Sequence, residues 1–429
     1  MLASTVMILF VVLLLLSVPI GAALGIISVA PSLIDPSFDI SVEFIIRSMF
    51  GGIDSFPLLA IPMFVLSGVI MARGGVSKRL FDVFSYFLAS RTAGIPCAVV
   101  VTCLFYGAIS GSAPATVAAV GSMSMPVMLK LGYDKKFSTA LIAVAGGLGV
   151  IIPPSIPFIL FGMATGASVS DLFLAGIFPG ILIAALLMGY SWYYCKKHGE
   201  DKERIQEEVN SLRSKGFFSI LKEGFWALMT PVIILGCIYT GVASPTEAAV
   251  ISVFYALLIS LFIYRTIKIK DLKAILIESL KTFTPILFIL ASAVAFSRIL
   301  TLLQVPQMAG SLITENFTSA FAVLVLINVL LLIVGMVMDT SPAILILAPI
   351  LTPIMSSFGM DPIQFGVIMV VNLAIGFVTP PIGVNLFIAS RLTEVPVFTI
   401  AKKAFPQIIL LLIALILICA FPQISLTLI

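Results

Sequence analysis

The sequence repeats itself once, and proline marks the repeat. The pair Pro153-Pro154 recurs as Pro380-Pro381, 227 residues further along, and each pair ends an apolar run of membrane-spanning length. Further matches fall within one residue of the same offset: 112–114 with 340–342, 132–134 with 359–361, 178–179 with 405–406, Pro57 with Pro285, and 19–23 with 245–249. A duplicated apolar chain with proline-interrupted segments at corresponding positions is typical of secondary transporters.

Composition indicates a membrane protein. Hydrophobic residues make up 60% of the 429 residues and charged residues 10%, with a mean hydropathy of +1.21. A soluble domain carries about 25% charged residues, so a lipid bilayer is the expected surrounding and no nucleic-acid partner is expected. Spans of about 20 residues leave room for roughly a dozen segments. The single histidine, His198, and five cysteines without paired spacing argue against a histidine-based metal centre and against disulfides.

The apolar runs predict an all-α polytopic fold. We expect helices at about 3–17, 20–34, 56–73, 135–166 (broken), 171–195, 226–242, 247–264, 283–303, 361–391 (broken) and 397–424. The stretches 94–130 and 319–358 are expected to be hairpins, with halves at Ile95–Ile109 and Ala115–Leu129, and at Phe321–Val337 and Ala343–Ser357. A half of about 15 residues gives roughly 22 Å of helix, less than the hydrocarbon core of about 30 Å. We therefore expect re-entrant hairpins.

The distribution of charge orients this layout, because cytoplasmic loops are enriched in Lys and Arg. One side holds 22 of the 24 Lys and Arg residues, in 73–91, 130–136, 195–223 and 265–281 and at 391, 402 and 403. Only Arg47 lies on the opposite side, and only Arg298 lies inside a span. The basic side is predicted to be cytoplasmic, with the N-terminus outside. The two hairpins then enter from opposite faces, so the repeats are inverted.

The chain divides accordingly into a first repeat at 1–195, a cytoplasmic linker at 196–225 and a second repeat at 226–429. Two stretches, 77–91 and 266–281, alternate charged with bulky apolar residues and predict arms along the cytoplasmic interface. Ordinary cytoplasmic loops are the alternative. The polar stretch 195–223 predicts a solvated helix.

Four clusters are expected to free backbone groups inside the membrane. We name them the first tip (110–114), the first break (146–155), the second tip (338–342) and the second break (376–381). Each proline removes an N–H and leaves a carbonyl one turn upstream without its donor. Such backbone is tolerated in a membrane where it lines a cavity or binds something, and carbonyl and hydroxyl oxygens suit Na⁺.

The duplication therefore predicts at least two Na⁺ sites. The residues expected to form them are Ser110, Gly111, Ser112 and Pro114; Gly149, Val150, Pro153 and Pro154; Met338, Asp339 and Thr340; and Gly376, Val378, Thr379 and Pro380. The alternative is that these prolines only kink their helices.

Several strings resemble the large membrane subunit of TRAP (tripartite ATP-independent periplasmic) transporters. They are GAISGSAPATVAAVGSMSMPVMLKLGY at 107–133, GGLGVIIPPSIPFILFG at 146–162, IPMFVLSGVIMARGG at 61–75 and GVASPTEAA at 241–249. The resemblance covers essentially the whole chain. The second tip, Asp339-Thr340-Ser341, departs from the Ser110-Gly111-Ser112 of the first, which leaves open whether both tips do the same job.

The resemblance implies an elevator-type Na⁺ symporter of a bacterial inner membrane, with a periplasmic N-terminus. The hairpins and broken helices would form a moving transport domain, and the arms and outer helices a scaffold. The implied partners are a small four-helix membrane subunit (Q type) and a periplasmic substrate-binding protein (P type). The implied substrates are organic acid anions, a sialic acid being expected before a C4-dicarboxylate.

Intramembrane polar residues are functional candidates by default. Arg298 is expected to bind a substrate carboxylate, since its planar fork suits that group; an ion pair with Asp339 or a contact with the outer interface are the alternatives. Asp339 is expected to serve Na⁺ or substrate, or to cap the following helix. Ser155 and Asn385 complete the expected substrate-binding set. Glu247 is expected to cap its helix.

Other functions remain as alternatives. A stand-alone Na⁺/dicarboxylate symporter of related fold would need no partner proteins, and an ion channel would need a continuous pore. An intramembrane enzyme would need a nucleophile–base pair or a metal cluster. The sequence offers neither, so the chain is not expected to be an enzyme.

Overall fold

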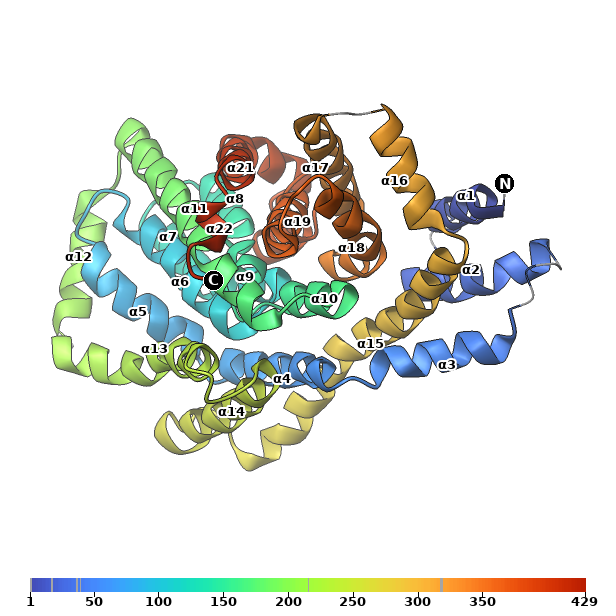
Figure 1. The fold of residues 1–429 in the computed structure, drawn as a ribbon. Helices are drawn as coiled ribbons and strands as arrows, with labels where there is room; N and C mark the ends of the chain where they lie inside the picture. The colour runs from blue at the N-terminus through green and yellow to red at the C-terminus, as the bar shows by residue number, and fades with distance from the viewer. Residues whose placement is uncertain (1, 17, 36–37, 39, 215, 317–318) are drawn as a thin grey trace.

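A computed structural model describes the chain except for residues 1, 17, 36–37, 39, 215 and 317–318. Every regular element in this described part is a helix (Figure 1). Eight of its helices are long and apolar enough to cross a membrane. The expected all-α polytopic architecture is thereby confirmed, as helices satisfy their own backbone hydrogen bonds inside lipid.

The first half of the chain forms eleven of the helices. They are α1 (Leu2–Leu15), α2 (Ile20–Ile34), α3 (Val42–Ile53), α4 (Ala60–Arg73), α5 (Val76–Leu88), α6 (Gly94–Ser110), α7 (Ala113–Lys130), α8 (Lys135–Ala145), α9 (Leu148–Ile151), α10 (Ile156–Thr165) and α11 (Val169–His198). A short 3₁₀ turn, η1 (Phe56–Leu59), precedes α4.

The polar linker forms α12 (Lys202–Ser214), the solvated helix expected there. After it come α13 (Phe217–Tyr239), α14 (Pro245–Leu258), α15 (Leu272–Leu302), α16 (Val305–Asn316), α17 (Ala320–Val337), α18 (Thr340–Ser357), α19 (Pro362–Gly376), α20 (Val384–Thr393), α21 (Val397–Ala420) and α22 (Gln423–Leu426).

The two halves of the chain interlock. In the upper part of Figure 1, α6 to α11 lie beside α17 to α21. There α10 packs on α18, α20 on α7 and α8, and α21 on α8 and α11. The remaining long helices form an outer layer in which α14 packs on α4, and α15 on α2, α3 and α4. Each half therefore contributes to both groups of helices.

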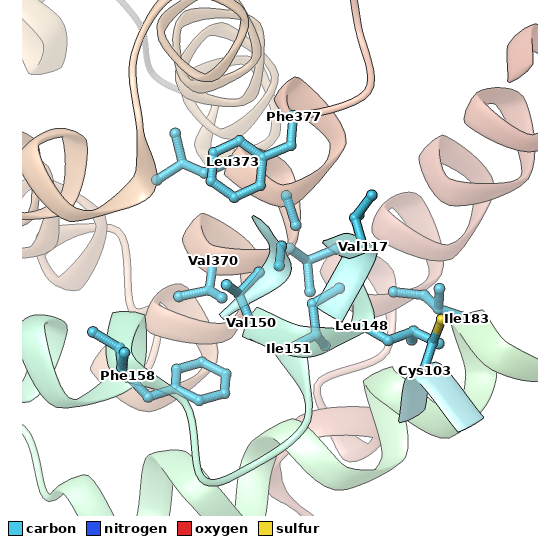
Figure 2. Packing of buried hydrophobic residues seen from close by; sticks show 14 of the residues in the cluster. Cys103, Val117, Leu148, Val150, Ile151, Phe158, Ile183, Val370, Leu373 and Phe377 are labelled. Atoms are coloured by element: carbon cyan, nitrogen blue, oxygen red, sulfur yellow. The ribbon is translucent and has the colours of Figure 1, made fainter. Parts of the chain in front are cut away.

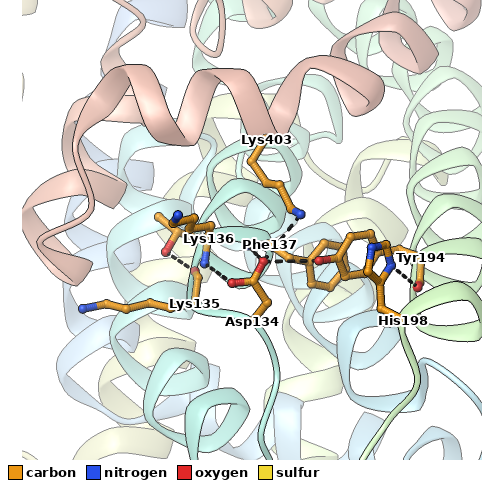
Figure 3. A network of polar contacts seen from close by, with 8 residues as sticks. Asp134, Lys135, Lys136, Phe137, Tyr194, His198 and Lys403 are labelled. Carbon is orange, nitrogen blue, oxygen red and sulfur yellow. Dashed lines mark hydrogen bonds and ion pairs between the residues drawn. The ribbon is translucent and has the colours of Figure 1, made fainter.

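A polar cluster ties three of the helices together at one end (Figure 3). Asp134 caps α8 by accepting hydrogen bonds from the backbone N–H groups of Lys136 (3.1 Å) and Phe137 (3.3 Å). The same carboxylate accepts from the Tyr194 hydroxyl of α11 (3.2 Å) and lies 3.5 Å from Lys403 Nζ of α21. Asp361 caps α19 in the same way, by accepting hydrogen bonds from the backbone N–H groups of Ile363 and Gln364.

The sequence did not predict two of the helices, α3 and α16. Helix α3 carries Glu43 and Arg47, which form an exposed ion pair at 2.6 Å, and Ser41 caps it. Helix α16 begins with Val305-Pro306 and contains Gly310. Both helices have twelve residues and interrupted apolar patterns. Both are held mainly by packing, α3 on α15 and α16 on α18, as short helices are marginal without tertiary contacts.

The arm expected at 266–281 is not a separate helix. Residues from Leu272 onward continue without a break through Pro285 into the predicted span, as the single helix α15. Helix α13 also begins earlier than expected, at Phe217. The arm expected at 77–91 corresponds to the separate helix α5.

The hairpin halves are longer than expected. Helices α6, α7, α17 and α18 have 17 or 18 residues, because each turn occupies only two residues. Pro114 and Pro342 lie in the first turns of α7 and α18 and not before these helices. Proline is tolerated in a first turn because the N–H that it lacks would have no acceptor within the helix. By length, α17 and α18 could each cross a membrane, so the re-entrant arrangement stays a prediction.

Candidate functional site

The first tip packs directly on the first break. Gly111 adopts a positive φ of 60° at the turn, and its carbonyl accepts the N–H of Ile156 at 3.3 Å. A side chain at Gly111 would meet the carbonyl oxygen of Pro154 at 3.0 Å. The turn therefore needs glycine both for its backbone conformation and for its closeness to the break.

Hydroxyl groups gather at the first tip. The Thr116 hydroxyl donates to the carbonyl of Ser112 (2.8 Å) and lies 3.0 Å from the Ser110 hydroxyl. Ser112 is the N-cap of α7. The residues Ser110 and Thr116 are buried, whereas Ser112 is partly exposed. The tip thus supplies several neutral oxygen atoms in a small volume.

Glycine pairs bring the hairpins into backbone contact with the breaks. A Cβ on Gly107 would lie 2.7 Å from the Cα of Gly149. In the second repeat, a Cβ on Gly376 would lie 2.3 Å from the carbonyl carbon of Gly335. Gly107 and Gly335 occupy corresponding positions in the duplication, as do Gly149 and Gly376. Both contacts are close enough that neither pair admits a side chain.

The first break frees two carbonyls from the helical pattern. Pro153 and Pro154 cannot donate to the carbonyls of Gly149 and Val150. Val150 O is instead satisfied by the Ser155 hydroxyl at 2.5 Å, and Ser155 also caps α10. The helices on either side of this break are bent by 41°. All residues from Gly149 to Ser155 are buried.

The second break has a related but more open construction. Pro380 and Pro381 again cannot donate to the carbonyls one turn upstream, and Phe377 O accepts the Asn385 N–H at 3.1 Å. The Thr379 hydroxyl donates to Ile375 O at 2.8 Å. Both Pro-Pro bonds, Pro153-Pro154 and Pro380-Pro381, are cis.

The second tip is built around a carboxylate. Asp339 Oδ1 accepts the Thr340 N–H at 2.6 Å and lies 3.2 Å from the Thr340 hydroxyl, so it caps α18. The Asp339 side chain remains exposed, beside the partly buried Met338. The two tips therefore differ in charge and in their hydroxyl groups, as the sequence suggested.

The helices that flank the two breaks pack together in the core. Helix α9 of the first break packs on α19, and Figure 2 shows Val150 beside Val370. The Asn385 side chain donates to the Ala143 carbonyl of α8 at 3.1 Å. Among the hydrogen bonds of the described residues, none joins the first tip to the second.

A cavity of about 830 Å³ reaches the first tip. It lies between α4, α5, α6, α7 and α15, and its lining includes Tyr106, Ser110 and Ser112. Lys78 and Glu278 line it near the basic ends of α5 and α15. The first tip is thus approachable from the end of the molecule that carries most Lys and Arg residues.

Arg298 lies apart from both tips. Its Nη1 donates to the Ser48 hydroxyl of α3 at 3.2 Å, and its side chain is exposed. Within the described part of the chain it forms no salt bridge with Asp339, whose carboxylate caps α18 instead. The ion pair considered as an alternative is therefore contradicted.

The other two expected substrate residues are interior. Ser155 and Asn385 are fully buried and bond to the carbonyls of Val150 and Ala143. In this conformation they hold backbone segments together. Glu247 completes a capping box with Ser244 at the start of α14, as expected.

Sequence reasoning missed three contributors to this region. Gly107 and Gly335 could have been found from the register of the repeat, because they align with the same offset as the tips. Thr116 carries no such signal, since Ile344 stands at its counterpart. No group of three or more His, Cys, Asp or Glu residues in the described ranges could hold a metal ion. The oxygen donors at the tips and breaks are carbonyls, hydroxyls and the single carboxylate of Asp339.

Comparison with known proteins places this architecture in a family. Residues 7–424 match the family described as "Tripartite ATP-independent periplasmic transporter, DctM component". The chain is 42% identical over 415 residues to the isethionate TRAP transporter permease protein DctMQ of Oleidesulfovibrio alaskensis; the match covers 97% of this chain and 64% of that protein. It is 40% identical to the C4-dicarboxylate TRAP transporter large permease protein DctM of Pseudomonas aeruginosa, covering 90% of each chain.

A third relative has another substrate in its name. The sialic acid TRAP transporter large permease protein SiaM of Vibrio cholerae is 34% identical over 97% of this chain and 96% of its own. Two solved structures share the fold at low identity. The Alcanivorax borkumensis YdaH transporter has a TM-score of 0.63 at 14% identity, covering 98% of this chain and 99% of its own.

The second structure is MtrF of Neisseria gonorrhoeae, with a TM-score of 0.66 at 13% identity over 94% of each chain. At such identity the likeness concerns the fold alone. The full-length family match and the three relatives decide the assignment: this chain belongs to the DctM family, the large membrane subunits of TRAP transporters.

Proposed function

We propose that this chain forms the membrane pathway of a Na⁺-coupled secondary transporter that imports an organic acid anion. A periplasmic binding protein would deliver the anion, and a small membrane subunit would complete the complex. The observation that carries the proposal is the repeated pairing of a hairpin tip with a proline-broken helix through Gly107–Gly149 and Gly335–Gly376.

The chemistry of the tips and breaks supports Na⁺ as the coupling ion. Both breaks contain carbonyls that lose a helical donor to proline, although those of Val150, Gly376 and Phe377 accept other hydrogen bonds. Hydroxyls of Ser110, Ser112, Thr116 and Thr379 lie beside them. Neutral oxygens in unwound backbone are the ligands that such transporters use for Na⁺. The first tip with the first break would hold one ion, and the second tip with the second break another.

The substrate class rests on the names of the relatives. These name isethionate, C4-dicarboxylates and sialic acid, which share an anionic carboxylate or sulfonate group. The narrower expectation of a sialic acid gains no support over the others. We therefore propose a small organic carboxylate or sulfonate.

The charge distribution supports an assignment of the side of the membrane to which this conformation opens. The cavity that reaches the first tip begins near Lys78 and Glu278, on the basic side that the positive-inside rule assigns to the cytoplasm. This conformation would then be open inward. In the proposed elevator movement, α6 to α11 and α17 to α21 shift together against α1 to α5 and α13 to α15.

The test is uptake into proteoliposomes. The chain would be reconstituted with its small subunit and binding protein, and uptake of labelled succinate, isethionate and N-acetylneuraminate measured with and without a Na⁺ gradient. For the acid that is transported, Ser112→Ala and Thr379→Ala should raise the half-saturating Na⁺ concentration by about tenfold, equivalent to about 1.4 kcal/mol.

The control is Thr240→Ala, which removes an exposed hydroxyl at the end of α13 and should leave Na⁺ dependence unchanged. Unchanged dependence in both test variants would contradict the ion-site assignment. Na⁺-driven uptake by the chain alone would instead favour a stand-alone symporter, and flux that never saturates would favour a channel.

A further inference from the structure

A second cavity, of about 380 Å³, lies at the boundary between the two groups of helices. Helices α3 and α15 form one wall, and α10 and α18 form the other. Its lining is mostly apolar, with Ser55, Ser297 and Arg298 as the polar side chains. This cavity is distinct from the one that reaches the first tip.

Arg298 brings an unpaired positive charge to this cavity. Among the described residues, its polar partner is the neutral hydroxyl of Ser48, which is fully buried. No carboxylate in the described ranges lies within salt-bridge distance of Arg298. Charged groups within membrane proteins are usually paired or functional. The cavity therefore lacks a counter-ion for its arginine.

A second group in the cavity also lacks a partner. The Ser55 hydroxyl is buried and, within the described part, forms no hydrogen bond. Buried polar atoms without partners are rare in folded proteins. Together, the guanidinium of Arg298 and the hydroxyl of Ser55 offer hydrogen-bond donors to an acceptor that carries negative charge, while Ser297 lines the same cavity.

Close packing fixes the arginine against this wall. A Cβ on Gly52 would lie 2.7 Å from Cβ of Val294, so α3 lies directly on α15 at this level. A Cβ on Gly51 would lie 3.8 Å from Arg298 Nη2. Ser48 holds Nη1 from one side, while Nη2 and Nε remain for a ligand. This geometry suits the two oxygens of a carboxylate or sulfonate.

We propose that Arg298 and Ser55 form an outer anion subsite, which receives the carboxylate or sulfonate of the substrate before the second tip does. The proposal rests on the elevator movement in the proposed function. The cavity wall on α18 includes Leu345 and Pro349, five and nine residues after Thr340. At 1.5 Å per residue, the second tip is about 8 to 14 Å away along α18. A shift of that size toward the outside brings the second tip beside Arg298.

The anion could also be the phosphate of an outer-leaflet phospholipid, since Arg298 lies four residues before the end of α15. The experiment therefore separates the two sources. In the reconstituted complex, Ser297→Cys would report on the cavity through its reaction with a membrane-impermeant thiol reagent added outside. The chain without this change gives the background from its five native cysteines.

We expect succinate, isethionate or N-acetylneuraminate to slow the reaction of the thiol reagent with the Ser297→Cys variant at least severalfold. Arg298→Gln in the same chain should abolish this protection, and Arg298→Lys should restore part of it. The matched control is Arg47→Gln, because Arg47 already pairs with Glu43 on the exposed face of α3. Protection that persists in Arg298→Gln, or that no organic anion produces, would overturn the subsite.

Uptake kinetics give a second readout. Arg298→Gln should raise the half-saturating concentration of substrate-loaded binding protein by about tenfold while changing the maximal rate by less than about twofold, since one charge-assisted contact is lost. If the modification rate instead follows the phosphatidylglycerol content of the vesicles and ignores added acids, the subsite belongs to lipid and the proposal is wrong. Absence of Na⁺-driven uptake in the unmodified complex would refute the proposed function, whereas the protection assay judges the subsite independently.

Discussion

Gly107 of α6 and Gly149 of the first break touch backbone to backbone, and Gly335 and Gly376 repeat this contact in the second half of the chain. Neither contact leaves room for a methyl group. Glycine therefore allows the hairpins and the breaks to pack backbone against backbone. This packing occurs at the two places where Na⁺ binding is proposed.

The close packing of Gly149 against the first tip predicts that Gly149→Ala destabilises the chain. The added Cβ would lie 2.3 Å from Thr116 Oγ1 and 2.6 Å from the Ser112 carbonyl oxygen. Overpacking of this kind costs about 1–3 kcal/mol, so the thermal midpoint of the purified protein should fall. Gly189→Ala in α11 is the matched control, because nothing lies within 4 Å of its new methyl group. Equal midpoints for the two variants would contradict the close contact.

The two roles of Asp339 can be separated by substitution. An asparagine keeps an oxygen that accepts the Thr340 N–H, so Asp339→Asn should preserve the cap of α18 and remove only the charge. We expect this variant to keep its thermal midpoint but to need more Na⁺ for half-maximal uptake. Asp339→Ala should also lose about 1 kcal/mol of stability. If Asp339→Asn transports with unchanged Na⁺ dependence, the carboxylate is a cap alone.

Glu200 ties the linker to the first hairpin. Its carboxylate accepts the Tyr133 hydroxyl at 2.6 Å and the Ala93 N–H at 3.0 Å. Burial, together with the hydrogen bond and charge of Glu200, raises the pKa of Tyr133 well above its usual range. Tyr133→Phe should cost about 1.5–3 kcal/mol, the usual value for a hydrogen bond to a charged group.

The measurement is the free energy of unfolding, with Tyr193→Phe as the control because Tyr193 is exposed. A Tyr133→Phe variant as stable as the control would show that this contact contributes nothing.

Acid should loosen the cluster around Asp134. Burial alone would raise the pKa of Asp134, but hydrogen bonds from Lys136 N–H, Phe137 N–H and the Tyr194 hydroxyl, with the charge of Lys403, hold that pKa below its ordinary value. A carboxyl group with a lowered folded pKa contributes stability above its unfolded pKa of about 3.9, and that stability disappears as the pH falls through the folded pKa.

The thermal midpoint should therefore drop as the pH falls from about 6 to about 3. Asp134→Asn should lower the midpoint at neutral pH and flatten the profile. An identical acid profile in wild type and variant would assign the loss to other carboxylates.

The sequence predicted the features that depend on local chemistry. A proline removes its own N–H wherever it stands, so Pro153-Pro154 and Pro380-Pro381 identified both breaks before any contact was known. The positions of the tips followed from the same register. The lengths of the helices beside the tips did not follow from the register. Pro114 and Pro342 lie within the first turns of α7 and α18, so these helices begin before the prolines.

Features that depend on neighbouring helices were out of reach. Pro285 lies inside a continuous helix, although the sequence suggested a boundary near it. The partner of Arg298 is Ser48, 250 residues away, and no pattern in the sequence connects them. Helices α3 and α16 have too little apolar length to be recognised, since their stability comes from what they pack against.

The continuity of α15 has a mechanical consequence. A helix of 31 residues is a rod of about 46 Å, with Glu278 near one end, bonded to Arg73 of α4, and Arg298 near the other. A joint between arm and span would have let the two ends move independently. A single helix instead links the two ends, so a displacement imposed at the basic end is passed along α15 toward the arginine at the far end.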